Sequence, residues 1–432
     1  MNRPDAPAGR QVFTRAVKPY AGDRPGGGSV SATLAKPYKC RVFNTIDEVD
    51  HEAWRRVCEQ AQASVFLDPR FAAAVETGMK ENCRFWYVIV DGDDGPAACA
   101  CLTATTINLL DFTDPRLAWV IRYGPGLSRF RQLKVLLCSL PGSPGDKSIA
   151  FASRRADPAV LDALDAVMDR LAAENDVDAV IYKEFAPSDL DAMQPLLSRG
   201  YRCVEIPAMH CLEPSFGNFA EYCAALRANY RMQITRSAKK LRKSGIEVRV
   251  LTDPQEILRL YIPEVHAMYC EMVGKSDLKV EVLTIDYYRQ LTTRLAGQIE
   301  LVTLMRDSKI VGFGWCLRDV STYHMMYAGI DYDLNQQFDL YFNLMYAGFD
   351  RALRAGVAKI NVGQTATAFK SRMGCYSEPR YVYMKGVGPL MSKLFYYGAN
   401  ILVIKKPSNP PADIFKRGGA ETPSERQDSA PA

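Results

Sequence analysis

The sequence predicts an α/β protein built from two copies of one domain, and three observations support this. The chain has 432 residues, more than a single hydrophobic core usually organises. Apolar residues make up 48% and charged residues 24%, as in ordinary globular proteins. One order of predicted elements, two helices, several strands, then helix, strand, helix and strand, occurs twice along the chain. We therefore expect two domains of the same fold.

The first copy is expected over residues 38–212. Apolar residues at a period of 3.6 predict helices, and short apolar runs bounded by turn residues predict strands. Residues 111–147, which are rich in Gly and Pro, are expected to form a loop over the cleft between the copies. The predicted helices are 47–60, 69–80, 158–174 and 190–198, and the predicted strands are 85–90, 97–106, 178–182 and 201–212.

The second copy is expected over residues 213–388 and repeats the same order. It begins with a strongly basic helix, predicted over 219–243. The later helices are predicted at 255–272, 285–296, 338–355 and 366–373, and the strands at 300–305, 310–317, 323–329, 359–362 and 381–385.

Both ends of the chain differ from this pattern. Residues 1–37 are rich in Pro, Gly, Ala and Ser, which predicts a disordered tail. Residues 389–432 combine an amphipathic segment with a polar tail that starts near Lys406. The amphipathic part has the composition of a segment that packs on the second domain or makes a peripheral membrane contact. The N-terminus lacks the apolar core of a secretory signal, so we expect a cytoplasmic protein.

Charge and cysteine usage exclude several classes of protein. A net charge of +5 is too small to indicate DNA binding. Twelve cysteines are scattered without any CxxC pair, which is typical of reduced thiols and gives no spacing for a structural zinc site. We therefore expect no metal.

Several short motifs in the second half carry a family resemblance. Residues 340–347 (LYFNLMYA), then Gly356, then 359–363 (KINVG) and 369–374 (FKSRMG), resemble the C-terminal half of FemAB-like and CelD-type acetyltransferases. The basic stretch 219–245 resembles the helix that joins the two copies in those proteins. The resemblance extends over about residues 38–388 and implies two tandem acetyltransferase (GNAT) folds.

The resemblance also implies a reaction. Members of these families transfer an acyl or aminoacyl group from a thioester or a tRNA ester to an amine, often in cell-envelope or exopolysaccharide pathways. It implies an N-acyltransferase that acts on a sugar, peptide or lipid-linked precursor. The co-substrate would be acyl-CoA or an acyl-carrier protein, with no tightly bound cofactor. The alternatives are an aminoacyl-tRNA-dependent transferase and a noncatalytic protein that binds an envelope precursor.

Two departures from the family bear on the donor. Residues 331–340 hold the place of the pyrophosphate loop but contain no glycine that would let backbone amides approach a phosphate. This weighs against the usual mode of CoA binding. No heptad run marks the coiled-coil insertion of the tRNA-dependent enzymes, so tRNA is a less favoured partner.

Lys370 is the first catalytic candidate. It matches the Lys of the family's Phe-Lys motif, and the resemblance implies that it holds a phosphate or the developing oxyanion. Gly363 and Gly374 belong to the same motif series and are candidates for the donor-binding wall. The competing interpretation of Lys370 is a solvated lysine on a short helix.

The remaining candidates would move a proton or hold the donor. His324 and Tyr327 lie on a predicted strand beside the transfer site and Asp331 follows its end, so each is a candidate proton acceptor, although a lone histidine on an apolar strand is commonly a core residue. Side chains that offer hydrogen-bond donors to the acyl group or positive charge to an anionic donor are Tyr341, Gln364, Arg227 and Arg231. The first copy, which has Tyr182-Lys183-Glu184-Phe185 in place of the motif series, is expected to be scaffold.

Overall fold

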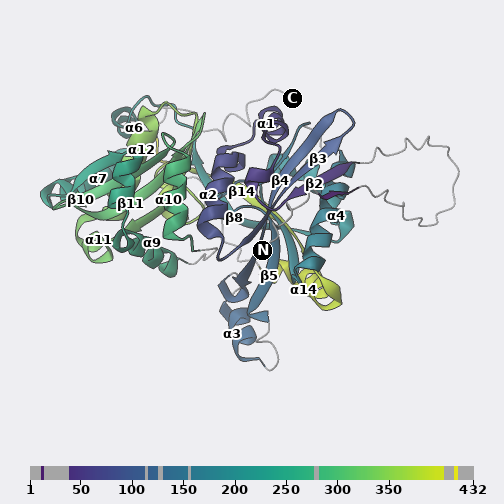
Figure 1. Cartoon of the computed structure of the whole chain (residues 1–432). Helices are drawn as coiled ribbons and strands as arrows, with labels where there is room; N and C mark the ends of the chain where they lie inside the picture. Colours follow the sequence, from purple (N-terminus) through teal and green to yellow (C-terminus); the bar gives the residue numbers. More distant parts are fainter. Residues whose placement is uncertain are drawn as a thin grey trace, which may run out of the picture.

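The computed structural model describes residues 11–13, 38–111, 115–124, 130–153, 157–276, 282–402 and 413–416. Most of the two predicted tails lies outside these residues. Within the predicted N-terminal tail, β1 (Gln11–Phe13) is described and pairs antiparallel with β2 (Lys39–Phe43). The protein is a mixed α/β structure whose strands join one continuous sheet (Figure 1).

The first half follows the predicted order of elements. The structure confirms the helix 158–174 at both ends and the remaining predicted elements to within a few residues. Its helices are α1 (His51–Ala61), α2 (Pro69–Met79), α3 (Pro115–Tyr123), α4 (Pro158–Glu174) and α5 (Leu190–Met193), and after β2 its strands are β3 (Arg84–Gly92), β4 (Gly95–Asn108), β5 (Gln132–Cys138), β6 (Ile149–Phe151), β7 (Ala179–Phe185) and β8 (Arg202–Leu212).

The second half repeats this order and occupies the other end of the sheet (Figure 1). Its helices are α6 (Phe219–Ala225), α7 (Ala228–Lys243), α8 (Pro254–Leu260), α9 (Pro263–Lys275), α10 (Ile285–Arg294), α11 (Tyr332–Phe338), α12 (Leu340–Arg354), α13 (Thr367–Ser371) and α14 (Gly388–Leu402). Its strands are β9 (Glu247–Leu251), β10 (Ile299–Arg306), β11 (Lys309–Arg318), β12 (Thr322–Ile330), β13 (Lys359–Asn361) and β14 (Tyr376–Gly386).

Asp-Pro pairs mark the starts of several helices, and in three of them the structure describes the aspartate. In α2, α4 and α8 the aspartate is the N-cap and proline is the first helical residue. Asp68, Asp157 and Asp253 each accept a hydrogen bond from a backbone amide of the first turn. The carboxylate satisfies an amide that the helix itself cannot, and proline there loses no hydrogen bond. This local chemistry explains why these boundaries were predictable.

The two halves exchange their last strands. In each half four antiparallel strands are followed by a fifth that pairs parallel to the fourth, β7 beside β5 and β13 beside β12. The last strand of the second half, β14, then lies between β7 and β8, while β8 of the first half pairs with β13. The domain boundary between residues 212 and 213 stays a prediction, because hydrogen bonds cross it in both directions.

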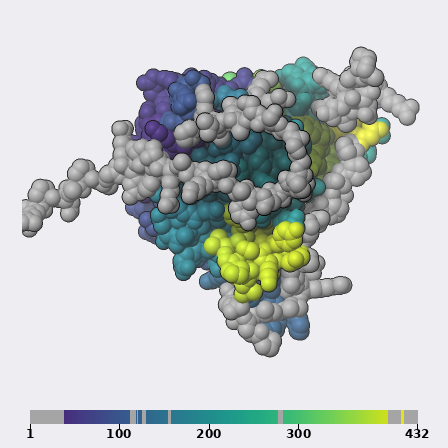
Figure 2. Space-filling model, turned by 90° about the vertical axis from the view of Figure 1, so that its right-hand side faces the viewer, coloured from purple at the N-terminus to yellow at the C-terminus, as the bar shows by residue number. Residues whose placement is uncertain are grey.

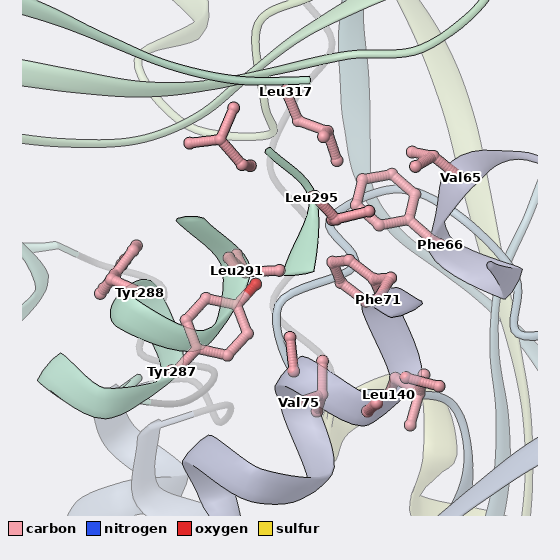
Figure 3. Close-up of a cluster of buried hydrophobic side chains, with 14 of the residues drawn as sticks. Val65, Phe66, Phe71, Val75, Leu140, Tyr287, Tyr288, Leu291, Leu295 and Leu317 are labelled. Atoms are coloured by element: carbon pink, nitrogen blue, oxygen red, sulfur yellow. The ribbon is translucent and has the colours of Figure 1, made fainter. Parts of the chain in front are cut away.

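A shared hydrophobic core joins the halves on one face of the sheet. It contains side chains from α1, α2, β3 and β4 of the first half and from α9, α10, β10 and β11 of the second. Figure 3 shows Phe71 and Val75 of α2 facing Leu291 and Leu295 of α10. The two helices approach closely at Gly78, where an added Cβ would lie 2.3 Å from the Cα of Tyr287. Such packing couples the halves into one body.

Three sequence predictions need correction. The predicted loop 111–147 contains α3 and the buried strand β5. Gln132–Cys138 forms a strand because its apolar side chains point alternately into the hydrophobic cores on the two faces of the sheet. The predicted helix 219–243 is broken at Leu226 and Arg227, whose extended backbone pairs with residues 413–416. The predicted helix 255–272 is broken at Tyr261 and Ile262, before Pro263, so that α8 and α9 are separate helices.

Candidate active site

A cavity of about 210 Å³ lies where β12 and β13 separate. The two strands pair only from Thr322 and Lys359 to His324 and Asn361, after which β13 ends and β12 continues. The separation leaves room between the carboxyl ends of two parallel strands, the usual place for a ligand in such sheets. Most of the wall is apolar, and its members include Met272, Val273, Trp315, Met325, Met326, Leu344, Met345 and Val362.

Five of the predicted site residues meet on this wall. Lys370, Tyr327, Tyr341, Gly363 and Gln364 all line the cavity. They come from β12, α12, α13 and the turn after β13, so the fold brings together positions that span more than forty residues of sequence. Their roles stay predictions, but their shared location is a structural fact.

Lys370 is buried, with 3% of its surface exposed. Burial lowers the pKa of its ammonium group to about 7, partly offset by the nearby Cys375 and Cys211. No hydrogen bond or ion pair of the ammonium is found within the described part of the chain, and its Nζ lies close to Gly363, 3.5 Å from where a Cβ would stand. The interpretation of Lys370 as a solvated lysine is therefore wrong.

The turn that carries Gly363 is fixed by His210 of β8. The His210 backbone pairs with Gly363 and Val362, and its ring nitrogens bond to the hydroxyls of Thr367 and Ser377 at 3.1 and 3.2 Å. Burial, together with the charge of Lys370, lowers the pKa of His210 to about 4. The ring is therefore neutral at pH 7, and it positions the turn without adding a second positive charge next to Lys370.

The first half contributes an acid that the sequence analysis treated as scaffold. Glu184, at the end of β7, lines the cavity and is 6% exposed. It accepts a hydrogen bond of 3.1 Å from Gln364 Nε2, and Lys183 Nζ lies 3.8 Å from its other oxygen. Burial raises the pKa of the Glu184 carboxyl, against the opposing effects of Lys183 and Arg380. Its backbone φ of 72° is strained for a residue with a side chain, which is frequent at functional sites.

Sequence reasoning could not single out Glu184, since the strand exchange alone places it beside the second half. The one signal was the pair Lys183-Glu184 inside an otherwise apolar strand. Ser143 and Pro144, from the segment predicted to cover the cleft, also reach the cavity wall. The first half is therefore part of the site as well as its support.

The structure places two other catalytic candidates away from the cavity. His324 is buried against Phe66, with ring centroids 4.9 Å apart, and bonds to Asn361. Burial lowers its pKa to about 4, and its ring packs against Phe66 of the shared core. Asp331 is the N-cap of α11 and accepts from the amides of Asp333 and Leu334. Neither His324 nor Asp331 lines the cavity.

Three predicted donor-binding residues make contacts within the protein. Arg227 forms an ion pair with Asp413 and donates to the Phe415 carbonyl, and Arg231 donates to the Leu226 carbonyl. Gly374 lies against Phe415, close enough that a Cβ there would approach its ring to 2.9 Å. Arg227 and Gly374 thus contact residues 413–416, Arg231 contacts the turn between α6 and α7, and none of the three lines the cavity.

A second, more open hollow of about 370 Å³ adjoins the cavity and shares Met272, Ser276, Tyr341 and Thr365 with it. It lies beside α11, where the pyrophosphate of a CoA thioester would meet backbone amides in a GNAT fold. Here Asp331 already occupies two of those amides, and a carboxylate repels a phosphate. Within the described ranges no group of three or more His, Cys, Asp or Glu side chains is placed to hold a metal ion.

The strand order and the cavity between parallel strands define a protein with two tandem GNAT folds. Residues 228–371 match the model of the acetyltransferase (GNAT) domain family. This match identifies a GNAT domain in the second half of the chain, and the predicted fold class of two tandem GNAT domains agrees with the repeated strand order. No curated protein sequence matches the chain.

Several solved structures are similar in fold at low sequence identity. FemX shares 12% identity, with 76% of this chain and 95% of that chain covered and a TM-score of 0.49. A tandem GNAT protein from the clavulanic acid biosynthesis pathway shares 12%, covering 82% and 99%, with a TM-score of 0.48. The C-terminal domain of a putative lysylphosphatidylglycerol synthetase from Agrobacterium fabrum shares 11%, covering 82% and 97%, with a TM-score of 0.46. No helix of the described residues is both long and apolar enough to cross a membrane.

Proposed function

We propose that this protein is an N-acyltransferase that moves an acyl group from a thioester to an amine of a sugar, peptide or lipid-linked envelope precursor. The single observation that carries the proposal is that one cavity is lined both by the buried ammonium of Lys370, which has no partner among the described residues, and by the buried carboxyl of Glu184. Burying a charge without a partner is costly, so a protein keeps such a group mainly where a ligand completes it.

The two groups suit the two needs of the reaction. The amine attacks the thioester carbon, the carbonyl oxygen gains negative charge, and the carbon–sulfur bond then breaks to release a thiolate that becomes a thiol. Lys370 would donate a hydrogen bond to the developing oxyanion. Glu184 would take the proton that the amine loses as the new amide forms. Gln364 would hold the Glu184 carboxylate in place, and no covalent intermediate with the protein is needed.

The apolar wall indicates the kind of acyl group. Methionine, leucine and tryptophan side chains favour an uncharged acyl chain, and the adjoining hollow gives a pantetheine arm a route to the surface. Because Asp331 occupies amides beside α11, we favour a donor whose phosphate lies away from this helix, such as an acyl-carrier protein, over acyl-CoA bound in the usual manner.

The test is release of free thiol from acyl thioesters of CoA and of a loaded carrier protein, with amino sugars and amino acids as acceptors. We expect release only when donor and amine are both present. Glu184→Gln should lower kcat about a hundredfold with little change in KM, and Glu205→Gln, at an exposed position on β8, is the matched control. Turnover that survives Glu184→Gln would remove Glu184 as the base, and no turnover with any donor would overturn the proposal.

One observation favours a second candidate, transfer from an aminoacyl-tRNA. The exposed side of α7 carries five basic residues, Arg236, Lys239, Lys240, Arg242 and Lys243. Such a surface would bind RNA phosphates with a steep dependence on salt. Binding of tRNA at low salt that is lost at moderate salt would support this candidate, and failure to bind tRNA at low salt would remove it.

A further inference from the structure

Exposed aromatic side chains gather on two helices that are distant in sequence. Among the described residues, the aromatic side chains with about half or more of their surface exposed are Trp119 and Tyr123 of α3, each 64%, and Tyr396 and Tyr397 of α14, 49% and 78%. Leu390 of α14 is also exposed. Large aromatic groups are costly to leave in water, so their concentration in one region points to a binding surface.

The fold holds these helices on one end of the molecule. Ile121 of α3 and Phe395 of α14 are both buried in a small core that covers β5, β7, β8 and β14. Each helix therefore has an inner side fixed to the sheet and an outer side that carries the aromatic residues. Figures 1 and 2 both show α3 and α14 next to one another at the lower end of the protein.

The aromatic groups are ordered by contacts with one another. Trp119 and Tyr123 are one helical turn apart, with ring centroids 5.6 Å apart, and the rings of Tyr396 and Tyr397 are 4.9 Å apart. Arg202 of β8 lies over the Tyr396 ring, 3.4 Å from its centroid. The surface is preformed, so binding would cost little side-chain ordering.

The charge of this surface selects the partner. Neither α3 nor α14 contains an aspartate or glutamate, whereas Arg122 and Lys393 are exposed beside the aromatic residues. Trp and Tyr prefer the headgroup level of a bilayer, where an apolar ring and a polar edge are both satisfied. Basic residues at the same level are attracted by anionic lipids. A second copy of the chain would present like charges and be repelled.

We propose that the outer sides of α3 and α14, with Trp119, Tyr123, Leu390, Tyr396, Tyr397, Arg122 and Lys393, form a surface that binds the headgroup layer of an anionic lipid bilayer. The rings enter the interface and the two basic side chains contact lipid phosphates. This surface is separate from the cavity, and the inference does not depend on the proposed enzymatic activity.

The experiment is flotation of the full chain with vesicles of phosphatidylcholine alone or with 30% phosphatidylglycerol. We expect binding to the anionic vesicles that is at least about tenfold stronger than to the neutral ones and weakens with salt. Trp54, Trp86 and Trp315 are buried, so a shift of tryptophan emission toward the blue on vesicle addition reports Trp119.

Two variants separate the contributions. The double variant Trp119→Ser/Tyr397→Ser should lose binding about tenfold or more, and Arg122→Glu/Lys393→Glu should lose the preference for anionic vesicles. The matched control is Met232→Ser/Val320→Ser, which removes exposed apolar side chains elsewhere, with circular dichroism confirming that all variants fold. Wild-type protein that does not float with anionic vesicles at low salt would overturn the proposal. Equal binding of all variants to anionic vesicles would also overturn it. So would a dimer that forms without lipid and that the Trp119→Ser/Tyr397→Ser substitutions convert to monomers.

Discussion

The two halves of the molecule each bury a charged side chain near their parallel strand pair, but they treat it differently. In the first half, Asp165 of α4 receives a 2.5 Å hydrogen bond from the Tyr201 hydroxyl, and Lys385 lies 3.6 Å away. In the second half, the Lys370 ammonium has no such partner among the described residues and lines a cavity. Burial raises the pKa of the Asp165 carboxyl, as it lowers that of the Lys370 ammonium, but only the Asp165 carboxyl finds its partners within the fold. The Lys370 ammonium is available to a ligand.

The parallel strand pairs of the two halves also differ, in how far the strands stay paired. Beside Asp165, β5 and β7 stay paired from Val135 and Ala179 to Cys138 and Tyr182, and the space around them is filled by side chains. Beside Lys370, the shorter β13 leaves β12 and creates the cavity. A repeated fold thus gives one closed copy and one open copy. The four predictions below test this contrast, from the largest expected effect to the smallest.

Replacing Lys370 should remove activity without harming the fold. Lys370→Met keeps the length of the side chain and removes the charge, so we expect turnover to fall about a hundredfold to a thousandfold. The free energy of unfolding should stay the same or rise, because an unpartnered buried ammonium is lost. Thiol release and denaturant unfolding measure the two effects. Lys239→Met, at an exposed position on α7, is the control, and a Lys370→Met protein that unfolds more easily would make Lys370 a structural residue.

The opposite result is expected at Asp165. Asp165→Ala leaves the buried Tyr201 hydroxyl without its acceptor, and we expect it to lower the free energy of unfolding by about 2 kcal/mol. Turnover per folded molecule should not change. The exposed Asp169→Ala on the same helix is the control, expected to change stability by less than about 0.5 kcal/mol. Equal effects of the two variants would remove the distinction between the two buried charges.

The free energy of unfolding should depend on pH through the titration of Lys370. The folded protein has a Lys370 pKa of about 7, below its ordinary value of 10.5, so between these values the unfolded chain binds more protons and stability rises with pH. The burial penalty is therefore complete below pH 7 and is relieved as the pH rises to about 10. The stability gained by Lys370→Met should accordingly be largest at pH 6 and shrink by pH 9. Denaturant unfolding at both values is the measurement, and a gain that grows with pH would contradict it.

The smallest effect is expected at the cavity wall. An alanine Cβ at Gly314 of β11 would lie 3.8 Å from Leu344, an ordinary contact, so Gly314→Ala should change stability by no more than about 0.5 kcal/mol. The added methyl group occupies cavity space, and we expect the preferred acyl chain to become shorter. Thiol release across donors of increasing length measures this. Gly274→Ala on α9, where nothing lies within 4 Å, is the control and should leave the preference unchanged.

The candidate site was only partly predictable. Lys370, Gly363 and Gln364 could be found because they lie together in one short motif after a strand. His324 was misplaced, because the side of a strand that a residue faces depends on which neighbours the sheet acquires. Arg227 and Arg231 have the chemistry of an anion site, but Arg227 bonds to Phe415 and Arg231 to the Leu226 carbonyl. The contact with Phe415 could not be predicted from any local pattern in the sequence.

The sequence by itself determined the repeated α/β order, most element boundaries and the motif around Lys370, because helix caps, turns and apolar periods are local properties of the chain. Only the tertiary structure decided that β14 and β8 change places, that Glu184 faces Gln364, and that α3 and α14 share one surface. These are contacts between residues 148 or more positions apart. They follow from how the sheet closes around its cores, which is a property of the whole chain and of no single segment.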